Sequence, residues 1–262
     1  MQEIIITTVV IGVIGLIIGI ALVAAGKKFY VAVDEKAIAV RECLPGNNCG
    51  ACGYAGCDAV AAAIAAGEAP VNACPVCSAD AVAKIGGVMG VEAEAAQRKT
   101  AQVKCSGDCE HTSAKCNYVG IEDCRAAALA GLNTGSCTFG CLGYGSCVKV
   151  CTYDAIHVVN GVAKVDTSKC VGCGMCAKAC PKGLIEVVRA DRTFVVQCSN
   201  KDRGPAVKKV CSAGCLGCGA CVKQCEHDAI HVEGNLAYID YDKCVGCGKC
   251  AEKCPAKNIV RQ

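Results

Sequence analysis

The spacing of the cysteines constrains this chain more than any other feature of its sequence. The chain has 28 Cys among 262 residues, and many of them are separated by only two residues. Cysteines spaced in this way share a turn and direct their sulfurs toward a common centre, which suits thiolates around iron or zinc better than disulfide partners. Nothing else in the chain is typical of a secreted protein, so we expect a reducing compartment and metal-bound thiolates.

Two cysteine-containing segments repeat at a constant offset. Residues 141–158 align with residues 215–232, and residues 169–181 (KCVGCGMCAKACP) align with residues 243–255 (KCVGCGKCAEKCP). Both pairs of segments are 74 residues apart, from 141 to 215 and from 169 to 243. The repeat therefore predicts two homologous modules in tandem.

A short β-hairpin is predicted between the two cysteine runs of each module. Asn160-Gly161 in the first module and Gly234-Asn235 in the second are dipeptides of the kind found in type I′ turns. The second runs fit C-x2-C-x2-C-x3-C-P, the bacterial ferredoxin pattern in which the fourth cysteine of each run binds the other run's cluster. Each module is therefore predicted to be ferredoxin-like and to hold two [4Fe-4S] clusters.

The crossed pattern predicts two complete four-thiolate sites in the second module. The two sets are Cys225 with Cys244, Cys247 and Cys250, and Cys254 with Cys215, Cys218 and Cys221. Zinc is the alternative metal for thiolates of this kind.

The first module lacks one ligand, because Tyr144 stands where the second module has Cys218. We expect Cys137, four residues before Cys141, to replace it, and its counterpart Cys211 to be redundant. The expected sets in the first module are then Cys137, Cys141, Cys147 and Cys180, and Cys151, Cys170, Cys173 and Cys176.

A further site is predicted nearer the N-terminus. Its four thiolates are Cys49, Cys52, Cys57 and Cys74. Glycines between the first three allow the backbone to wrap closely, and Asp58 is expected to cap the Ala-rich helix that follows. A structural zinc site and unliganded packing cysteines are the alternatives. Cys43 and Cys77 break the spacing and are left unassigned.

The region between the N-terminal site and the modules is the least clear. Residues 78–104 contain no cysteine and are predicted to be a helical, Ala-rich connector. A sixth cluster would use Cys105, Cys109, Cys116 and Cys124, although their spacing matches no known pattern. Cys105 also aligns with Cys198, which favours a shared structural role for that pair. His157 and His231 occupy equivalent hairpin positions, where surface packing is expected.

The N-terminal segment is apolar. Residues 4–25 contain no charged residue and are followed by Lys27 and Lys28. A run of this length is long enough to cross a bilayer as a helix, and the positive-inside rule then places the bulk of the chain in the cytoplasm. We therefore expect a single transmembrane anchor in the cell (inner) membrane.

The order of these features resembles that of a known family. An N-terminal anchor, a C-x2-C-x4-C-x16-C domain and tandem two-cluster modules, taken together, resemble the RnfB family, the iron–sulfur subunits of the Rnf complex, which is the ion-translocating ferredoxin:NAD oxidoreductase. The resemblance implies an electron-entry subunit of a translocase. Its implied partners are soluble ferredoxin as donor, the other subunits of a membrane complex that moves Na⁺ or H⁺, and membrane lipid.

The sequence is thus predicted to be an α+β chain of five segments. They are the anchor (1–26), a small helical 4Fe-4S domain (27–90), a helical connector with extra cysteines (91–134), and ferredoxin modules at 135–192 and 193–262. Five [4Fe-4S] clusters are expected, with a sixth if the extra cysteines bind one.

No residue of this chain is predicted to perform covalent catalysis. The sequence has no G-x-G-x-x-G and no P-loop, and its formal net charge of +3 does not favour nucleic acid. Ferredoxin is expected to dock on the second module, beside Lys249, Lys253 and Lys257. The alternative function is a membrane-anchored polyferredoxin that serves a corrinoid or other reductase without pumping ions.

Overall fold

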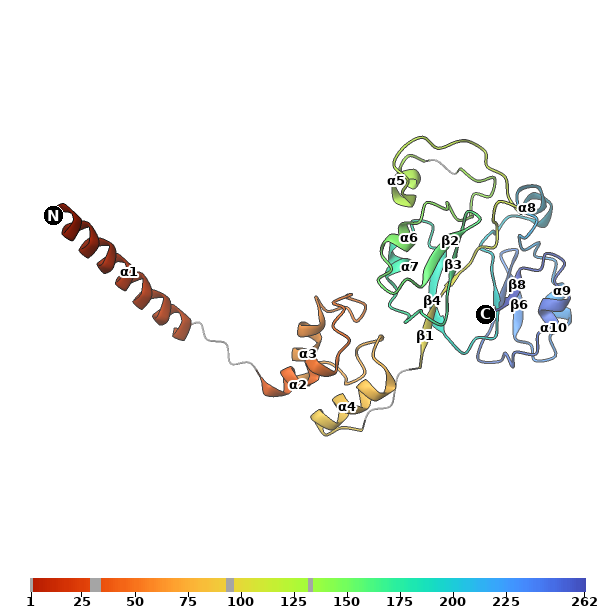
Figure 1. Ribbon diagram of the computed structural model, residues 1–262. Coiled ribbons are helices and arrows are strands. Elements are labelled where there is room, and N and C mark those ends of the chain that lie inside the picture. The colour runs from red at the N-terminus through yellow and green to blue at the C-terminus, as the bar shows by residue number, and fades with distance from the viewer. Residues whose placement is uncertain (1, 29–33, 93–96, 132–133) are drawn as a thin grey trace.

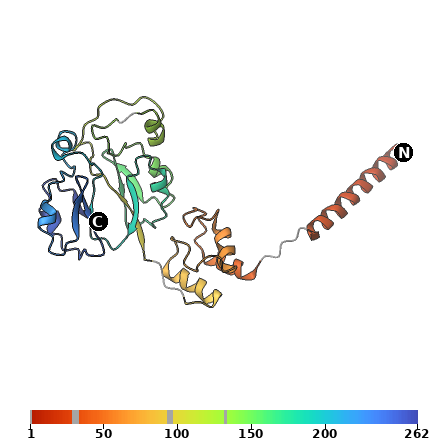
Figure 2. The same ribbon diagram turned by 180° about the vertical axis from the view of Figure 1, so that it is seen from behind.

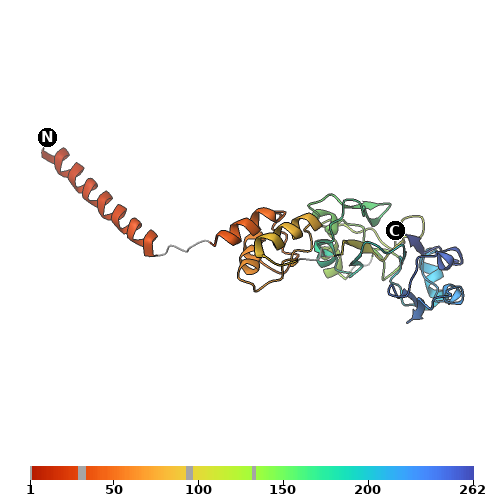
Figure 3. The same cartoon turned by 90° about the horizontal axis from the view of Figure 1, so that it is seen from below.

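The chain is arranged as four parts in a row. The computed structural model describes residues 2–28, 34–92, 97–131 and 134–262, with only the backbone of residues 2–5 and 7–11. Helix α1 stands apart, followed by a helical domain and two small β-containing modules (Figure 1). The same order is visible from below (Figure 3) and from behind (Figure 2). The structure thus combines helices with small antiparallel sheets, as expected of an α+β chain.

Helix α1 covers Gln2–Lys28 and ends in the two lysines. Within the part of the chain that the structure describes, no helix combines the length and the apolar character needed to cross a membrane. The expected transmembrane anchor is therefore not supported by the structure.

The helical domain packs three short helices around a small aliphatic core. They are α2 (Glu35–Cys43), α3 (Cys57–Ala65) and α4 (Ala79–Met89). Val40, Ile64 and Ile85 are fully buried between them. Asp58 does not cap α3 as expected, since the N-cap is Gly56 and makes no side-chain bond. The Asp58 carboxylate instead accepts a 2.7 Å hydrogen bond from Nε of Arg41 on α2, tying the two helices together.

The two modules have the same plan, each with two two-stranded antiparallel sheets. The first module contains β1 (Lys99–Val103), α5 (Cys124–Leu129), α6 (Ser146–Lys149), β2 (Ile156–Val159), β3 (Val162–Val165), α7 (Met175–Ala179) and β4 (Ile185–Arg189). The second contains β5 (Phe194–Val196), α8 (Gly204–Val210), α9 (Ala220–Lys223), β6 (Ile230–Glu233), β7 (Leu236–Ile239), α10 (Lys249–Glu252) and β8 (Ile259–Arg261). In each module an inner hairpin, β2–β3 or β6–β7, is accompanied by a sheet of first and last strands, β1–β4 or β5–β8.

Both predicted hairpins are confirmed. Strand β2 pairs with β3 from Ile156↔Val165, and β6 pairs with β7 from Ile230↔Ile239. The turn residues have the positive φ angles of a type I′ turn, 51° and 80° at Asn160-Gly161 and 52° and 64° at Gly234-Asn235.

The predicted helical connector differs from the structure in its second half. Residues 99–103 form strand β1, which pairs with β4 in the register Lys99↔Arg189 to Val103↔Ile185. Pairing with a strand more than eighty residues away overrides the local helical preference of this stretch, because Thr100 to Val103 become buried. The first module therefore begins well before residue 135.

Candidate iron–sulfur sites

The second module gathers its cysteines as the crossed pattern predicts. One cavity of about 20 Å³ is lined by Cys225, Cys244, Cys247 and Cys250. A second cavity of about 20 Å³ is lined by Cys215, Cys218, Cys221 and Cys254. Each cavity thus joins three cysteines of one run to the fourth cysteine of the other. The donor set of four cysteines fits a [4Fe-4S] cluster at both places.

Backbone N–H groups are directed at the sulfur of the fourth cysteine of a run. Ala229 N donates to Cys225 Sγ at 3.3 Å, and the same i+4 bond occurs at Cys151 and Cys180, both at 3.5 Å. The last run of the second module differs, because Cys254 Sγ donates to Oδ1 of buried Asn258 at 3.2 Å. Hydrogen bonds to sulfur are one of the means by which a protein sets a cluster's potential.

One site of the first module is also assembled from the expected cysteines. Cys170 and Cys176 are buried in the module core, with Cys151 packed against it. Burial, followed by the neighbouring thiolates of Cys170 and Cys173, raises the pKa of Cys176 to about 12. Ala101 N on β1 donates to Cys170 Sγ at 3.3 Å, so the unpredicted strand contributes directly to this site.

The other site of the first module includes a cysteine that the sequence did not assign to it. Burial raises the pKa of Cys147 to about 11, with further contributions from the thiolates of Cys141, Cys124 and Cys180. The pKa of Cys141 is likewise raised by burial, then by Cys124 and Cys180. Cys124 therefore lies close to Cys141 and Cys147. Cys137, the expected fourth ligand, lines a cavity together with Cys105, Cys141, Cys198 and Cys211.

Helix α5 holds Cys124 in this place by contacts on both sides. Cys124 N donates to Oγ of buried Ser146 at 2.7 Å, and Ser146 Oγ donates to the N-cap Asp123 at 2.7 Å. On the other side, Arg125 Nε donates to Ala179 O at 3.4 Å. Ser146 and Ala179 directly precede Cys147 and Cys180, so α5 is fixed to both neighbours of the site. Tyr144, which stands where the second module has Cys218, packs against the apolar cluster that includes Cys124.

The helical domain brings together more thiols than the four expected ones. Cys57 and Cys74 are buried in its core, and Cys43, Cys52 and Cys77 pack against them. A hydrogen bond from Cys77 lowers the pKa of Cys74 to about 6. The same bond, together with burial, raises the pKa of Cys77. Cys77 therefore lies next to an expected ligand.

The helical domain and the first module meet at Tyr153. Asn47 Nδ2 makes a hydrogen bond to the Tyr153 hydroxyl. Burial raises the pKa of Tyr153, and the thiolates of Cys49 and Cys173 add to the shift. Cys49 also contributes to the raised pKa of Cys173. Two expected sites in different parts of the chain thus lie next to each other.

The four cysteines named for a sixth cluster lie in different surroundings. Cys105 faces a cavity with Cys137, whereas Cys124 lies beside Cys147. Cys109 and Cys116 are exposed, and Cys109 lies against the hairpin glycine Gly161. Among the described residues, no three His, Cys, Asp or Glu side chains are arranged to hold a single metal ion. The ligand assignments themselves stay predictions.

Comparison with known proteins gives relatives along most of the chain. The chain is 46% identical over 235 residues to the B component of the "Na(+)-translocating ferredoxin:NAD(+) oxidoreductase complex" of Acetobacterium woodii, covering 89% of this chain and 71% of the relative. It is 38% identical over 247 residues to the B component of the "Ion-translocating oxidoreductase complex" of Methanosarcina acetivorans, covering 94% of each. The chain belongs to the RnfB family. A relative from Clostridium ljungdahlii, the B component of its "Proton-translocating ferredoxin:NAD(+) oxidoreductase complex", is 41% identical over 92% of this chain and 85% of its own length.

Family models locate the iron–sulfur regions of this RnfB chain. The model "Putative Fe-S cluster" matches residues 44–76, in the helical domain. "4Fe-4S binding domain" matches residues 163–186, and "4Fe-4S dicluster domain" matches residues 214–258. The last match includes all eight cysteines that line the two cavities of the second module. Ferredoxin-like 4Fe-4S domains are therefore confirmed.

Proposed function

We propose that this chain is the iron–sulfur electron-transfer subunit of an ion-translocating ferredoxin:NAD oxidoreductase complex. The observation that carries the proposal is the second module, where each of two cavities is lined by one crossed set of four cysteines. The names of its relatives support the same function. The clusters, when bound, supply one-electron carriers, and the residues of the chain hold them, space them and limit their contact with water.

The geometry favours five ligand sets of four cysteines. The helical domain uses Cys49, Cys52, Cys57 and Cys74, and the second module uses the two sets that line its cavities. The first module uses Cys151, Cys170, Cys173 and Cys176, and a revised set of Cys124, Cys141, Cys147 and Cys180. Cys124 replaces Cys137 because α5 is fixed beside both Cys147 and Cys180.

Electrons enter at the second module, where the thiolates reach the surface. Cys218 and Cys247 are exposed, whereas Cys173, the counterpart of Cys247 in the first module, is partly buried. Val245 beside Cys247 is 63% exposed and provides apolar contact area for a soluble ferredoxin. The direction of transfer then runs from the second module through the first to the helical domain, which meets it at Tyr153.

Positive charge on the second module guides an acidic ferredoxin to this surface. Lys253 and Lys257 are exposed near the last cysteine run. Lys249 has less effect, because its ammonium makes a 2.5 Å ion pair with Glu226. Such attraction weakens as salt rises, since the Debye length falls from about 10 Å at 0.1 M to about 3 Å at 1 M.

The N-terminal segment attaches the subunit to the cell membrane of an Rnf-type complex. The uncharged run of residues 4–25 followed by Lys27 and Lys28 supports this proposal. Flotation of the full chain with lipid vesicles, compared with a chain lacking residues 1–28, tests it. Equal recovery of both chains in the lipid fraction would show that attachment does not use this segment.

Stopped-flow reduction of the cluster-loaded full chain by reduced ferredoxin tests the electron-transfer function. We expect Lys253→Glu with Lys257→Glu to slow reduction most at low salt. The matched control is Lys208→Glu with Lys209→Glu, which makes the same charge change on exposed residues of α8. A loaded chain that ferredoxin does not reduce would overturn the proposed function. Equal slowing in both double variants would overturn the proposed docking surface.

A further inference from the structure

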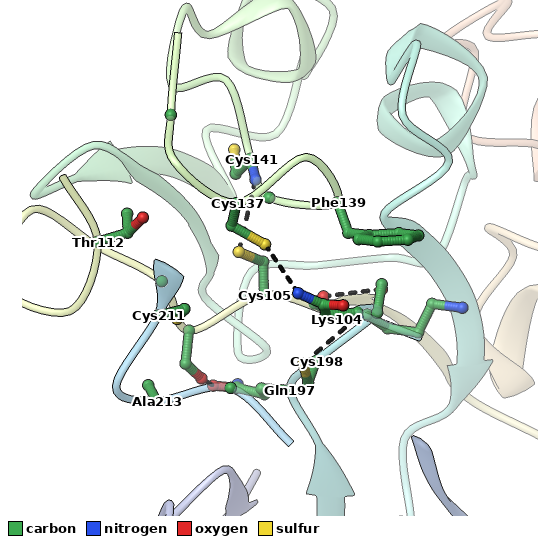
Figure 4. A pocket seen from close by; sticks show the side chains of 17 residues that line it. Lys104, Cys105, Thr112, Cys137, Phe139, Cys141, Gln197, Cys198, Cys211 and Ala213 are labelled. Atoms are coloured by element: carbon green, nitrogen blue, oxygen red, sulfur yellow. Dashed lines mark hydrogen bonds between the residues drawn. The ribbon is translucent and has the colours of Figure 1, made fainter. Parts of the chain in front are cut away.

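Four cysteines outside the five sets meet where the two modules touch. Cys105, Cys137, Cys198 and Cys211 line one cavity of about 30 Å³. The last three are at most 8% exposed, and Cys105 is partly buried. The cavity also touches Cys141, but Figure 4 shows the sulfur of Cys141 directed away from those of Cys105 and Cys137. Cys141 therefore belongs to its own module's site, and four thiols remain.

These four cysteines are two pairs of equivalent residues from the tandem repeat. Cys137 and Cys211 are 74 residues apart, which is the offset of the repeat. Cys105 follows the end of β1 by two residues, and Cys198 follows the end of β5 by two residues. Each module therefore contributes the same two cysteines, and the cavity lies between equivalent places in the two modules.

The chain segments that carry these cysteines are fixed to each other across the interface. Ser199 Oγ donates to Lys104 O at 2.9 Å, and Ser106 Oγ donates to Gln197 Oε1 at 2.8 Å. Next to Cys211, Thr112 Oγ1 donates to Val210 O at 2.9 Å. The cavity is thus part of a built interface in which both modules hold the sulfurs in place.

Asn200 and Gly107 each lie close to two of the four sulfurs. Asn200, which is 2% exposed, donates from Nδ2 to Cys137 Sγ at 3.5 Å and from its backbone N to Cys198 Sγ at 3.4 Å. Gly107 lies beside the other two, since a Cβ there would be 3.2 Å from Cys211 Sγ and 3.7 Å from Cys105 Sγ. N–H donors directed at buried sulfurs are typical of thiolates that hold a cluster.

The cavity is also connected to one site in each module. Cys141 N donates to Cys105 Sγ at 3.5 Å, and Cys215 N donates to Cys198 Sγ at 3.2 Å. Cys141 and Cys215 are ligands in the sets proposed for the first and second modules. The four thiols therefore lie between the two modules' donor sets.

We propose that Cys105, Cys137, Cys198 and Cys211 hold a [4Fe-4S] cluster shared by the two modules. Its cavity is at least as large as the two cavities of the second module, which are about 20 Å³ each and whose cysteines lie within the 4Fe-4S dicluster match. Among the described residues that line it, Lys104 alone is cationic, and its ammonium is paired with Glu186. Iron ions supply the positive charge that four buried thiolates need.

Iron content of the anaerobically prepared full chain tests this site without reference to electron transfer. Six sets of four cysteines hold about 24 iron per chain, whereas five sets hold about 20. We expect Cys198→Ala and Cys211→Ala each to lose about four iron and four sulfide. The matched control Cys109→Ala removes an exposed cysteine outside every set and should lose none.

The iron and zinc contents distinguish the proposed cluster from a zinc site and from unliganded cysteines. About 20 iron in the unsubstituted chain, or full iron content in Cys198→Ala and Cys211→Ala, would overturn the proposal. One zinc per chain that disappears in both variants would also overturn it, because zinc would then occupy the four thiols. If a variant fails to fold, the iron count of the unsubstituted chain and of Cys109→Ala decides the question.

The position of the shared site implies a role that rests on the proposed function. With Cys211→Ala, ferredoxin should still reduce the second module, while reduction of the first module becomes at least tenfold slower. Freeze-quench electron paramagnetic resonance distinguishes the two modules if each is assigned with single-cysteine variants. An unchanged rate with about four iron missing would overturn the role and leave the site standing.

Discussion

Gly217 offers a test of how the hairpin positions a ligand loop. It lies between Cys215 and Cys218 with φ of +61°, and a Cβ there would be 2.7 Å from Asn235 O and 3.0 Å from two more backbone atoms of Asn235. Gly219 has a similar φ of +69°, but a Cβ there meets no atom within 4 Å. Alanine at either position carries the left-handed backbone cost of about 1–2 kcal/mol. Gly217→Ala alone also clashes with the hairpin.

The difference between these two variants isolates the clash. Forcing an extra carbon into a packed place costs about 1–3 kcal/mol, because backbone atoms cannot rotate away. With a guanidinium slope of about 4 kcal/mol/M, Gly217→Ala should release iron at a midpoint roughly 0.25–0.75 M lower than Gly219→Ala. The assay follows iron release to a ferrous chelator from the anaerobic full chain. Equal midpoints would show that contact with Asn235 does not hold the loop.

Three further predictions concern other contacts. Cys124→Ala should lose about four iron, as expected of a ligand, whereas the control Cys116→Ala, which removes an exposed cysteine, should lose none. An iron content equal to that of the unsubstituted chain in both variants would contradict the revised set. Tyr153→Phe removes the hydrogen bond to Asn47 and should increase amide hydrogen exchange in residues 46–50, and unchanged exchange would show that this contact does not order the loop. Ile230→Ala removes a fully buried side chain and should destabilise the second module by about 2–5 kcal/mol. The measurement is iron release at a lower denaturant concentration. A change below about 0.5 kcal/mol would mean that this side chain does not support the fold.

The spacing of the cysteines was sufficient to predict which cysteines come together within the second module. The crossed sets of the second module follow from runs in which two or three residues separate each cysteine from the next, and each cavity is lined by one of those sets. The hairpins likewise follow from turn dipeptides, because φ above zero at Asn160 and Asn235 is a local property. Sequence reasoning works here because the interactions that decide the structure are close in sequence.

Two features that the sequence did not predict depend on contacts between residues that are remote in sequence. Strand β1 forms because β4 is available as a partner, and nothing within residues 99–103 indicates that pairing. Cys137 was assigned to the nearest incomplete site, whereas the structure places it beside Cys198 and Asn200 of the other module. The alignment of Cys105 with Cys198, together with the 74-residue offset of Cys137 and Cys211, was the signal that could have located the interface. It shows which residues are equivalent, but equivalence does not by itself show contact.

The closure of each module by its first and last strands has a consequence for biosynthesis. Strand β1 pairs with β4, and β5 pairs with β8. Each outer sheet can therefore form only after the last strand of its module has been synthesised. Until then β1 and β5 are unpaired edges, which are prone to aggregation, and the cysteines between the paired strands are accessible to assembly factors. We expect nascent chains to require protection during this interval.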